Sequence, residues 1–154
     1  MDTNDPRLVE SNKNLTERIK KLDDFIVTVL KYHVSVEQSL AELIEAHGQK
    51  AADTFYEKIV QCEGLKPPEV DTATWEVLKK ANRLRNAVAH KIDGPEVNDA
   101  MVELRAAYAA LSAQSAKDEK AMTNVQLAMS AFTHCGSCII VATENKKRSP
   151  SALS

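Results

Sequence analysis

Two side chains with complementary chemistry lie close together in the middle of this 154-residue chain. Arg85 is followed directly by Asn86 and, after three further residues, by His90. A guanidinium can hold a phosphate through two parallel hydrogen bonds, and an imidazole can move a proton near neutral pH. These two groups are the minimum that cleavage of RNA requires, so Arg85, Asn86 and His90 are the candidate catalytic residues.

This segment resembles the RX4-6H motif of the HEPN superfamily, the higher eukaryotes and prokaryotes nucleotide-binding domains. It has an arginine, a polar residue directly after it, and a histidine after three further residues. Many members of that superfamily are metal-independent endoribonucleases, and some are toxins. The resemblance implies an all-α fold, a four- to five-helix bundle with a long first helix. It also implies a homodimer in which both copies of the motif line one composite active-site cleft.

The chemistry implied by this resemblance is transesterification of single-stranded RNA. His90 would take the proton from a ribose 2′-hydroxyl, whose oxygen then attacks the neighbouring phosphorus and leaves a 2′,3′-cyclic phosphate. Arg85 would stabilise the phosphate oxygens, and Asn86 would orient His90 or donate to the phosphate. In a symmetric cleft the second His90 would protonate the leaving oxygen. This reaction needs no metal or cofactor, and it spares DNA, which lacks the 2′-hydroxyl.

The chain departs from the superfamily at one position that concerns regulation. HEPN toxins paired with a nucleotidyltransferase antitoxin commonly carry Tyr two residues after the motif His, and this chain has Ile92 there. Control by nucleotide transfer onto that residue is therefore not expected. An antitoxin or regulatory protein of another kind stays open as a partner.

Basic residues cluster around the motif although the chain as a whole is slightly acidic. The net charge is -2 and the isoelectric point is near 6.1, so bulk charge does not indicate a protein that coats nucleic acid. The local cluster predicts RNA contacts, with Arg83, Lys91 and Lys79 as the substrate-binding residues. The alternative is a solvated basic helix face.

A second polar pair, His33 and Glu37, lies one helical turn apart in the first predicted helix. The pair could complete the RNA cleft or hold Arg85 in place. The alternative interpretation is a core or interface histidine that is satisfied by Glu37.

The three cysteines do not predict a disulfide scaffold, and their small odd number fits a reducing, cytoplasmic location. Cys135 and Cys138 form a Cys-x-x-Cys pair that could bind zinc or cycle redox, but only His134 and the distant Cys62 could add ligands. We therefore interpret them as small buried packing residues. We find neither a secretion signal at the start nor a later apolar run long enough to span a membrane.

Apolar positions with alternating steps of four and three residues predict helices along the whole chain. The first is predicted to begin at an Asn14 cap and to end at Gly48, and a second covers 51–62. The third carries the motif from about Trp75 to Lys91 or Ile92, and further helices cover 97–111 and 122–139. The predicted domain is 15–145, between a flexible N-terminal segment, 1–14, and a flexible tail, 146–154.

Helix geometry sets a constraint on the motif. At about 100° per residue, Asn86 and His90 lie roughly 40° apart on one face, whereas Arg85 and His90 lie roughly 140° apart. One straight helix cannot aim both groups at one phosphate. Either the chain bends there, or Arg85 works with groups elsewhere, including a second subunit.

Two other functions stay open on the sequence alone. One is a catalytically inactive HEPN-like module that binds RNA, nucleotide or a protein partner and uses Arg85 and His90 only to hold phosphate. The other is a structural helical adaptor.

Overall fold

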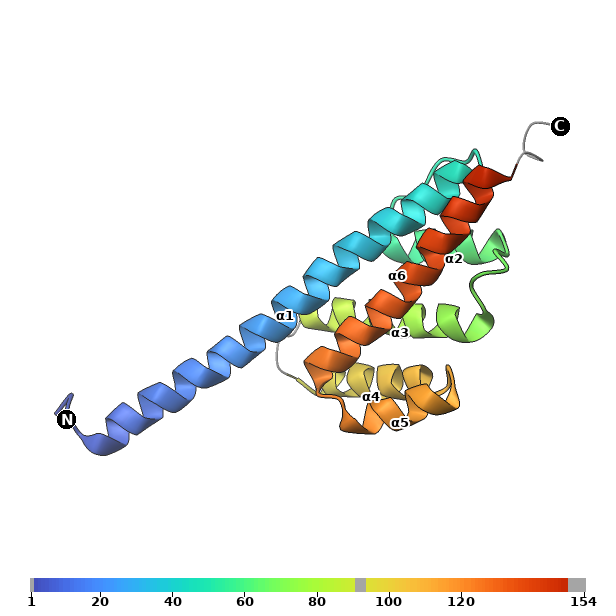
Figure 1. Ribbon diagram of the computed structural model, residues 1–154. Coiled ribbons are helices and arrows are strands. Elements are labelled where there is room, and N and C mark those ends of the chain that lie inside the picture. Colours follow the sequence, from blue (N-terminus) through green and yellow to red (C-terminus); the bar gives the residue numbers. More distant parts are fainter. Residues whose placement is uncertain (1, 91–93, 150–154) are drawn as a thin grey trace.

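The computed structural model describes residues 2–90 and 94–149, and every regular element in that part of the chain is a helix (Figure 1). The all-α prediction is confirmed, but the predicted count of four or five helices is wrong. The six helices are α1 (Pro6–Ala46), α2 (Phe55–Gly64), α3 (Thr72–His90), α4 (Pro95–Ala109), α5 (Ala113–Ala121) and α6 (Asn124–Arg148).

Helix α1 has 41 residues and is therefore about 60 Å long. It begins at Pro6, because Asp5 caps the first turn by accepting a hydrogen bond from the Arg7 backbone N–H at 2.9 Å, and proline suits the first helical position. The predicted start at Asn14 is wrong, and residues 6–14 belong to this helix. At the other end Gly48 adopts a φ of +74°, which glycine accepts without strain, so the predicted end is confirmed.

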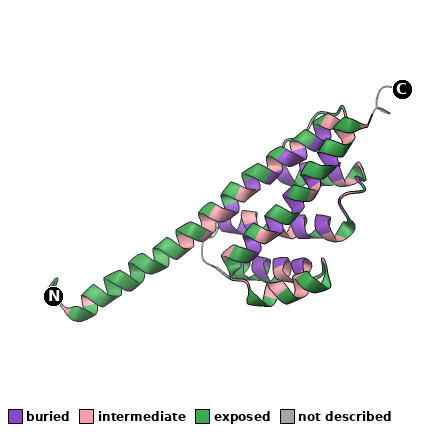
Figure 2. Cartoon of the chain, viewed as in Figure 1, coloured by how far each residue is buried: buried purple, intermediate pink, exposed green. Residues whose placement is uncertain are grey.

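The two halves of α1 have different surroundings. Its C-terminal half packs side by side with α6, and α2 and α3 cover it from another side (Figure 1). Its N-terminal half projects beyond the bundle and is exposed along most of its length (Figure 2). We call the projecting part, residues 6–24, the α1 overhang.

The core lies where α1, α3 and α6 meet. Its fully buried side chains come from every helix except α5, and the largest are Phe132, Leu40, Leu43, Ile44, Ile59, Leu78, Leu84 and Leu104. Gly136 of α6 faces Val36 of α1 so closely that a Cβ on the glycine would lie 3.4 Å from Val36 Cγ2. The absence of a side chain at 136 therefore allows the two longest helices to approach each other.

Helix α6 meets the length and composition needed to cross a membrane, contrary to the prediction that no such stretch exists. Its Leu127, Phe132 and Ile139 are fully buried against the rest of the bundle. We therefore interpret its apolar character as that of a core helix. It runs to Arg148, so the prediction of a flexible tail is wrong for residues 146–148, which are helical. Residues 150–154 of that predicted tail lie outside the described residues.

Helix α5 was missed by the sequence analysis because it contributes no buried residue and so has no apolar period to detect. Arg105 of α4 holds this region together. Its guanidinium donates to the backbone oxygens of Glu119 and Met122 and to the side chains of Glu119 and Asn124, all within 2.9–3.0 Å. One side chain thus ties α4 to the end of α5 and the start of α6.

We expect Arg105→Met to lower the free energy of unfolding by about 1–3 kcal/mol, because it leaves partly buried carbonyl and carboxylate oxygens without their donor. Urea unfolding followed by circular dichroism measures this loss. The control is Arg7→Met at the exposed tip of α1, which should change the free energy by less than about 0.5 kcal/mol. Equal, small effects of the two substitutions would show that Arg105 does not secure this junction.

Candidate functional site

Arg85 lies in a cleft between α1, the start of α2 and α3. This cleft, which we call the Arg85 cleft, has a volume of about 430 Å³. Its lining is mostly polar and consists of His33, Glu37, Thr54, Phe55, Tyr56, Asn82, Arg85 and Asn86. The structure therefore brings the predicted Arg85 and Asn86 together with the supporting pair His33 and Glu37, which come from a different helix.

Helix α3 aims Arg85 toward this cleft because its apolar face fixes its rotation. Trp75, Leu78, Leu84 and Val88 are buried in the core, and Arg85 lies at the edge of that face. The first turn of α3 is secured by Asp71, whose carboxylate accepts from the Thr74 backbone N–H at 2.8 Å.

The Arg85 guanidinium is partly buried and only partly used. Its Nη1 donates to Asn86 Oδ1 at 3.1 Å, and its Nε is buried with no hydrogen-bond partner among the described residues. No acidic side chain in the described part of the chain forms an ion pair with it. Because an unsatisfied buried donor is costly, Arg85 is prepared to donate to an anion that enters the cleft.

His33 lies beneath the cleft with only 5% of its surface exposed. Its ring packs on Phe55 at a centroid distance of 4.3 Å, and its Nε2 is 3.7 Å from Glu37 Oε2, too far for a hydrogen bond. The alternative interpretation, a histidine fully satisfied by Glu37, therefore does not fit this geometry. The Nε2 atom is a second buried polar atom of the cleft without a partner.

Burial and two nearby positive charges favour the neutral form of His33. Burial lowers the pKa of its imidazole, and the positive charges of Arg85 and Lys58 lower it further, whereas the Glu37 carboxylate opposes them. Lys58 is itself buried and donates to Glu37 Oε1 at 3.0 Å and to the Asp53 carbonyl at 3.1 Å. Glu37 is thus paired with Lys58. The positive charge of Arg85 is therefore available to a ligand that enters the cleft.

His90 is not part of the Arg85 cleft. It is exposed at the last residue of α3 and does not line the cleft, which agrees with the angle of roughly 140° between it and Arg85. At the same 100° per residue it lies within roughly 20° of Arg83, on the opposite side of the helix. A single copy of the chain therefore does not aim Arg85 and His90 at one phosphate.

The basic cluster expected around the motif is spread over different faces and is largely neutralised. Lys79 pairs with Glu63 of α2 at 2.8 Å and with Glu76 at 3.6 Å, and the Glu63 carboxylate raises the pKa of Lys79. Arg83 forms an ion pair with Glu103 of α4, and its guanidinium lowers the pKa of that carboxyl. Because both side chains already form ion pairs, the structure does not favour the interpretation that Arg83 and Lys79 are free to bind RNA. Lys91 lies outside the described residues.

Several cleft residues were missed by the sequence analysis. Asn82 stands one turn before Asn86, so helical spacing alone could have added it to the motif face. Thr54 and Glu57 form a capping box that starts α2, and this Thr-x-x-Glu signal is visible in the sequence. The role of Lys58 could not have been found, since it depends on α2 packing against α1.

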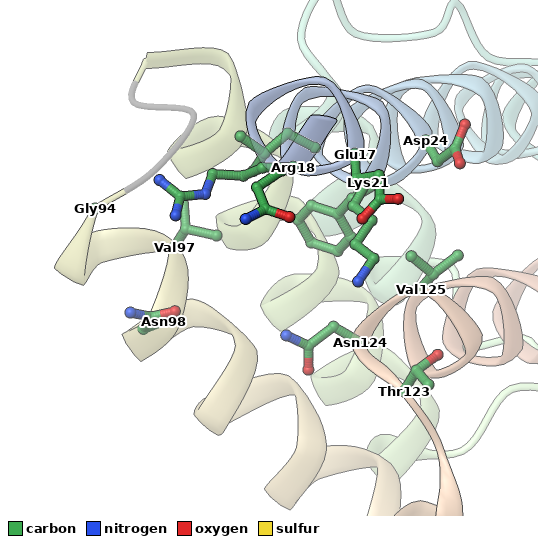
Figure 3. Close-up of a pocket in the computed structure, with 13 residues that line it drawn as sticks. Glu17, Arg18, Lys21, Asp24, Gly94, Val97, Asn98, Thr123, Asn124 and Val125 are labelled. Carbon is green, nitrogen blue, oxygen red and sulfur yellow. The ribbon is translucent and has the colours of Figure 1, made fainter. Parts of the chain in front are cut away.

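A larger hollow than the Arg85 cleft lies at the root of the α1 overhang and has a volume of about 770 Å³. Arg18 extends toward the start of α4, and Thr123 and Asn124 border the hollow from α6 (Figure 3). Glu17 and Asp24 also line it, and neither of the unpartnered buried atoms named above belongs to it. The smaller Arg85 cleft is therefore the better candidate site.

The Cys-x-x-Cys segment has the geometry of packing residues. Cys135 is buried and its Sγ lies 3.6 Å from the Thr74 carbonyl, while Cys138 Sγ lies 3.9 Å from His134 Nε2. Burial raises the pKa of both thiols and raises that of Cys62 to about 12, so none is an activated thiolate. Among residues 2–90 and 94–149, no three His, Cys, Asp or Glu side chains are grouped to hold a metal ion.

Comparison with known proteins finds no match: no protein-family model, curated protein or solved structure is significantly similar to this chain.

The lowered pKa of His33 predicts how stability depends on pH. Because its folded pKa lies below the unfolded value of 6.5, the unfolded chain binds the proton more readily. The full stability is therefore present above about pH 6.5 and is lost as the pH falls through the folded pKa. In His33→Gln the loss of unfolding free energy that comes from protonation of His33 should disappear. Urea unfolding between pH 7.5 and about 5 measures this change. The control His134→Gln, outside the cleft, should keep the wild-type slope; an unchanged slope in His33→Gln would contradict the assignment.

Proposed function

We propose that the chain is a metal-independent endoribonuclease of the HEPN type that cleaves single-stranded RNA and acts as a toxin or defence effector. The observation that supports this proposal most is the guanidinium of Arg85, which is held in a polar cleft and has no carboxylate partner among residues 2–90 and 94–149. A preorganised guanidinium in a partly desolvated cleft is suited to the charge that develops on a phosphate during transesterification.

In this proposal Arg85 holds the non-bridging oxygens of the scissile phosphate, and Asn86, at the mouth of the cleft, adds a donor. The proton transfers belong to His90, whose exposed position at the end of α3 leaves it open to a substrate or a second subunit. Because one copy directs Arg85 and His90 to different sides of α3, the proposal includes a homodimer with two equivalent sites, in each of which His90 of one copy reaches the Arg85 cleft of the other. This differs from the single cleft that the resemblance implies: the same His90 takes the proton from the 2′-hydroxyl and gives it to the leaving 5′-oxygen. A regulatory protein would then act by covering that cleft.

The alternative function is a catalytically inactive HEPN-like module that binds RNA, nucleotide or a protein partner. The observation that favours it is the separation of His90 from the Arg85 cleft within one copy. Such a module would bind RNA through Arg85 and leave it intact.

A cleavage assay on single-stranded RNA in the presence of EDTA tests the proposal. We expect cutting that leaves 2′,3′-cyclic phosphate ends, spares a DNA strand of the same sequence, and falls by about 10²–10³-fold in Arg85→Ala and about 10²–10⁴-fold in His90→Ala. Arg7→Ala, which removes an exposed arginine far from the cleft, should cut at the wild-type rate. RNA that is bound tightly but never cut would instead support the binding module.

Mixing the two inactive variants tests whether the site is shared between copies. If Arg85 and His90 act across a subunit boundary, Arg85→Ala mixed with His90→Ala should regain about a quarter of wild-type activity, since half of the dimers each carry one intact site. A mixture as inactive as its components would show that the two groups do not act across that boundary.

A further inference from the structure

One aromatic side chain beside the Arg85 cleft is left open to solvent. Tyr56 lies in the first turn of α2 and is 53% exposed, and no other Phe, Tyr or Trp in the described part of the chain is classed with it as exposed. Phe55, the residue before it, is buried against His33 at a ring-centroid distance of 4.3 Å. Single exposed apolar residues are common on proteins, so the position of Tyr56 beside the cleft is what makes it informative.

Tyr56 is shared by two hollows. It lines the Arg85 cleft, and it also lines a second hollow with a volume of about 410 Å³, which we call the α2 hollow. The other residues that line the α2 hollow are Lys50, Ala52, Glu57, Val60 and Gln61. Because the two hollows have this ring in common, a ligand held in the Arg85 cleft can extend over Tyr56 into the α2 hollow.

The rotation of α2 turns an apolar pair toward solvent. Phe55 and Ile59 are buried in the core. Tyr56 and Val60 lie one helical turn apart, roughly 40° from each other around the helix axis, so their side chains are neighbours. Val60 is 49% exposed. The pair therefore presents an aromatic ring next to an apolar side chain, which suits the face of a planar base.

The segment that leads into α2 is fixed in place by Gln61. Its Oε1 accepts from the Ala52 backbone N–H at 2.9 Å, and its Nε2 donates to the Lys50 carbonyl at 3.0 Å. Lys50 is exposed and forms no ion pair within residues 2–90 and 94–149. Glu57 also lines the hollow, and its carboxylate accepts from the Thr54 backbone N–H at 3.4 Å in the capping box. The α2 hollow thus has a fixed border and contains a cation that is available to a ligand.

We propose that Tyr56 is a base-stacking platform for a single strand of RNA whose phosphate is held by Arg85. The nucleotide next to that phosphate stacks its base on the Tyr56 ring and against Val60, in the α2 hollow. Lys50 then contacts the phosphate on the far side of that base. This inference rests on the proposed function, because it takes RNA to be the ligand of Arg85.

The order of charge and aromatic surface favours a nucleic-acid strand as the occupant. A cation without a carboxylate partner in the described part of the chain lies in each hollow, and the exposed ring is common to both. Proteins that bind single strands combine cations that follow the backbone with aromatic rings on which bases stack. Every base has a face that can stack, and a paired base in a duplex has its faces covered by its neighbours. The platform therefore predicts a preference for unpaired nucleotides without a preference for one base.

Fluorescence anisotropy with a labelled single-stranded 2′-deoxy oligonucleotide, which lacks the nucleophile for cleavage, tests the platform. We expect Tyr56→Ala to weaken binding by about 5–100-fold, as loss of one stacked base does, and Tyr56→Phe to stay within about 2-fold of wild type. The matched control is Val102→Ala, which truncates an exposed valine of α4 and should bind as wild type does. Because Tyr56 is exposed, all variants should keep the circular dichroism spectrum of the wild type.

A strand of abasic spacers separates stacking from a structural role of Tyr56. Wild type and Tyr56→Ala should bind this strand equally, and both more weakly than wild type binds the strand with bases. The platform would be overturned if Tyr56→Ala bound the strand with bases as tightly as wild type does. It would also be overturned if the substitution weakened binding to both strands by the same factor.

The platform and the nuclease can fail separately. If Tyr56→Ala cuts RNA with the KM of wild type, the platform is overturned and the nuclease stands. If RNA is never cut but its binding depends on both Tyr56 and Arg85, the platform is supported and the nuclease is overturned. A wild-type protein that does not bind the uncleavable strand would overturn both.

Discussion

The fold depends on burial of one face of the C-terminal half of α1. Val29, Val36, Leu40 and Leu43 form this face, and each is at most 4% exposed. It fixes where α6 lies, and Gly136 lets the two helices approach closely. Because α2 and α3 pack on the same half of α1, this burial also decides which polar side chains meet at the Arg85 cleft.

The same packing determines which charged and polar side chains meet in the Arg85 cleft. His33 occupies a position in the buried period of α1, where its surroundings lower its pKa and favour its uncharged form. Lys58 forms an ion pair with Glu37, and no carboxylate in the described part of the chain pairs with Arg85. Two buried nitrogen atoms, His33 Nε2 and Arg85 Nε, have no hydrogen-bond partner among the residues that the structure describes. Such unsatisfied atoms are a local cost that native proteins tolerate most often where function requires it.

The sequence analysis predicted what depends on local pattern and missed what depends on distant contacts. Apolar periodicity located α1, α3 and α6, and the angle between Arg85 and His90 followed from helix geometry alone. The start of α1 was misplaced because the Asp5-Pro6 cap is as good a start signal as Asn14, and α5 has no buried residue to reveal it. The basic cluster looked open because Glu63 and Glu103, which pair with Lys79 and Arg83, come from α2 and α4.

The central claim is that the guanidinium of Arg85 is positioned to bind a phosphate group. Nuclear magnetic resonance can observe the Nε–Hε group of this guanidinium directly. A short 2′-deoxy oligonucleotide, which lacks the nucleophile for cleavage, is titrated into protein labelled with ¹⁵N while the arginine Nε–Hε signals are followed. The account predicts that the Arg85 signal moves with added oligonucleotide and that the Arg7 signal stays in place. An Arg85 signal that does not respond, while other signals do, would contradict it.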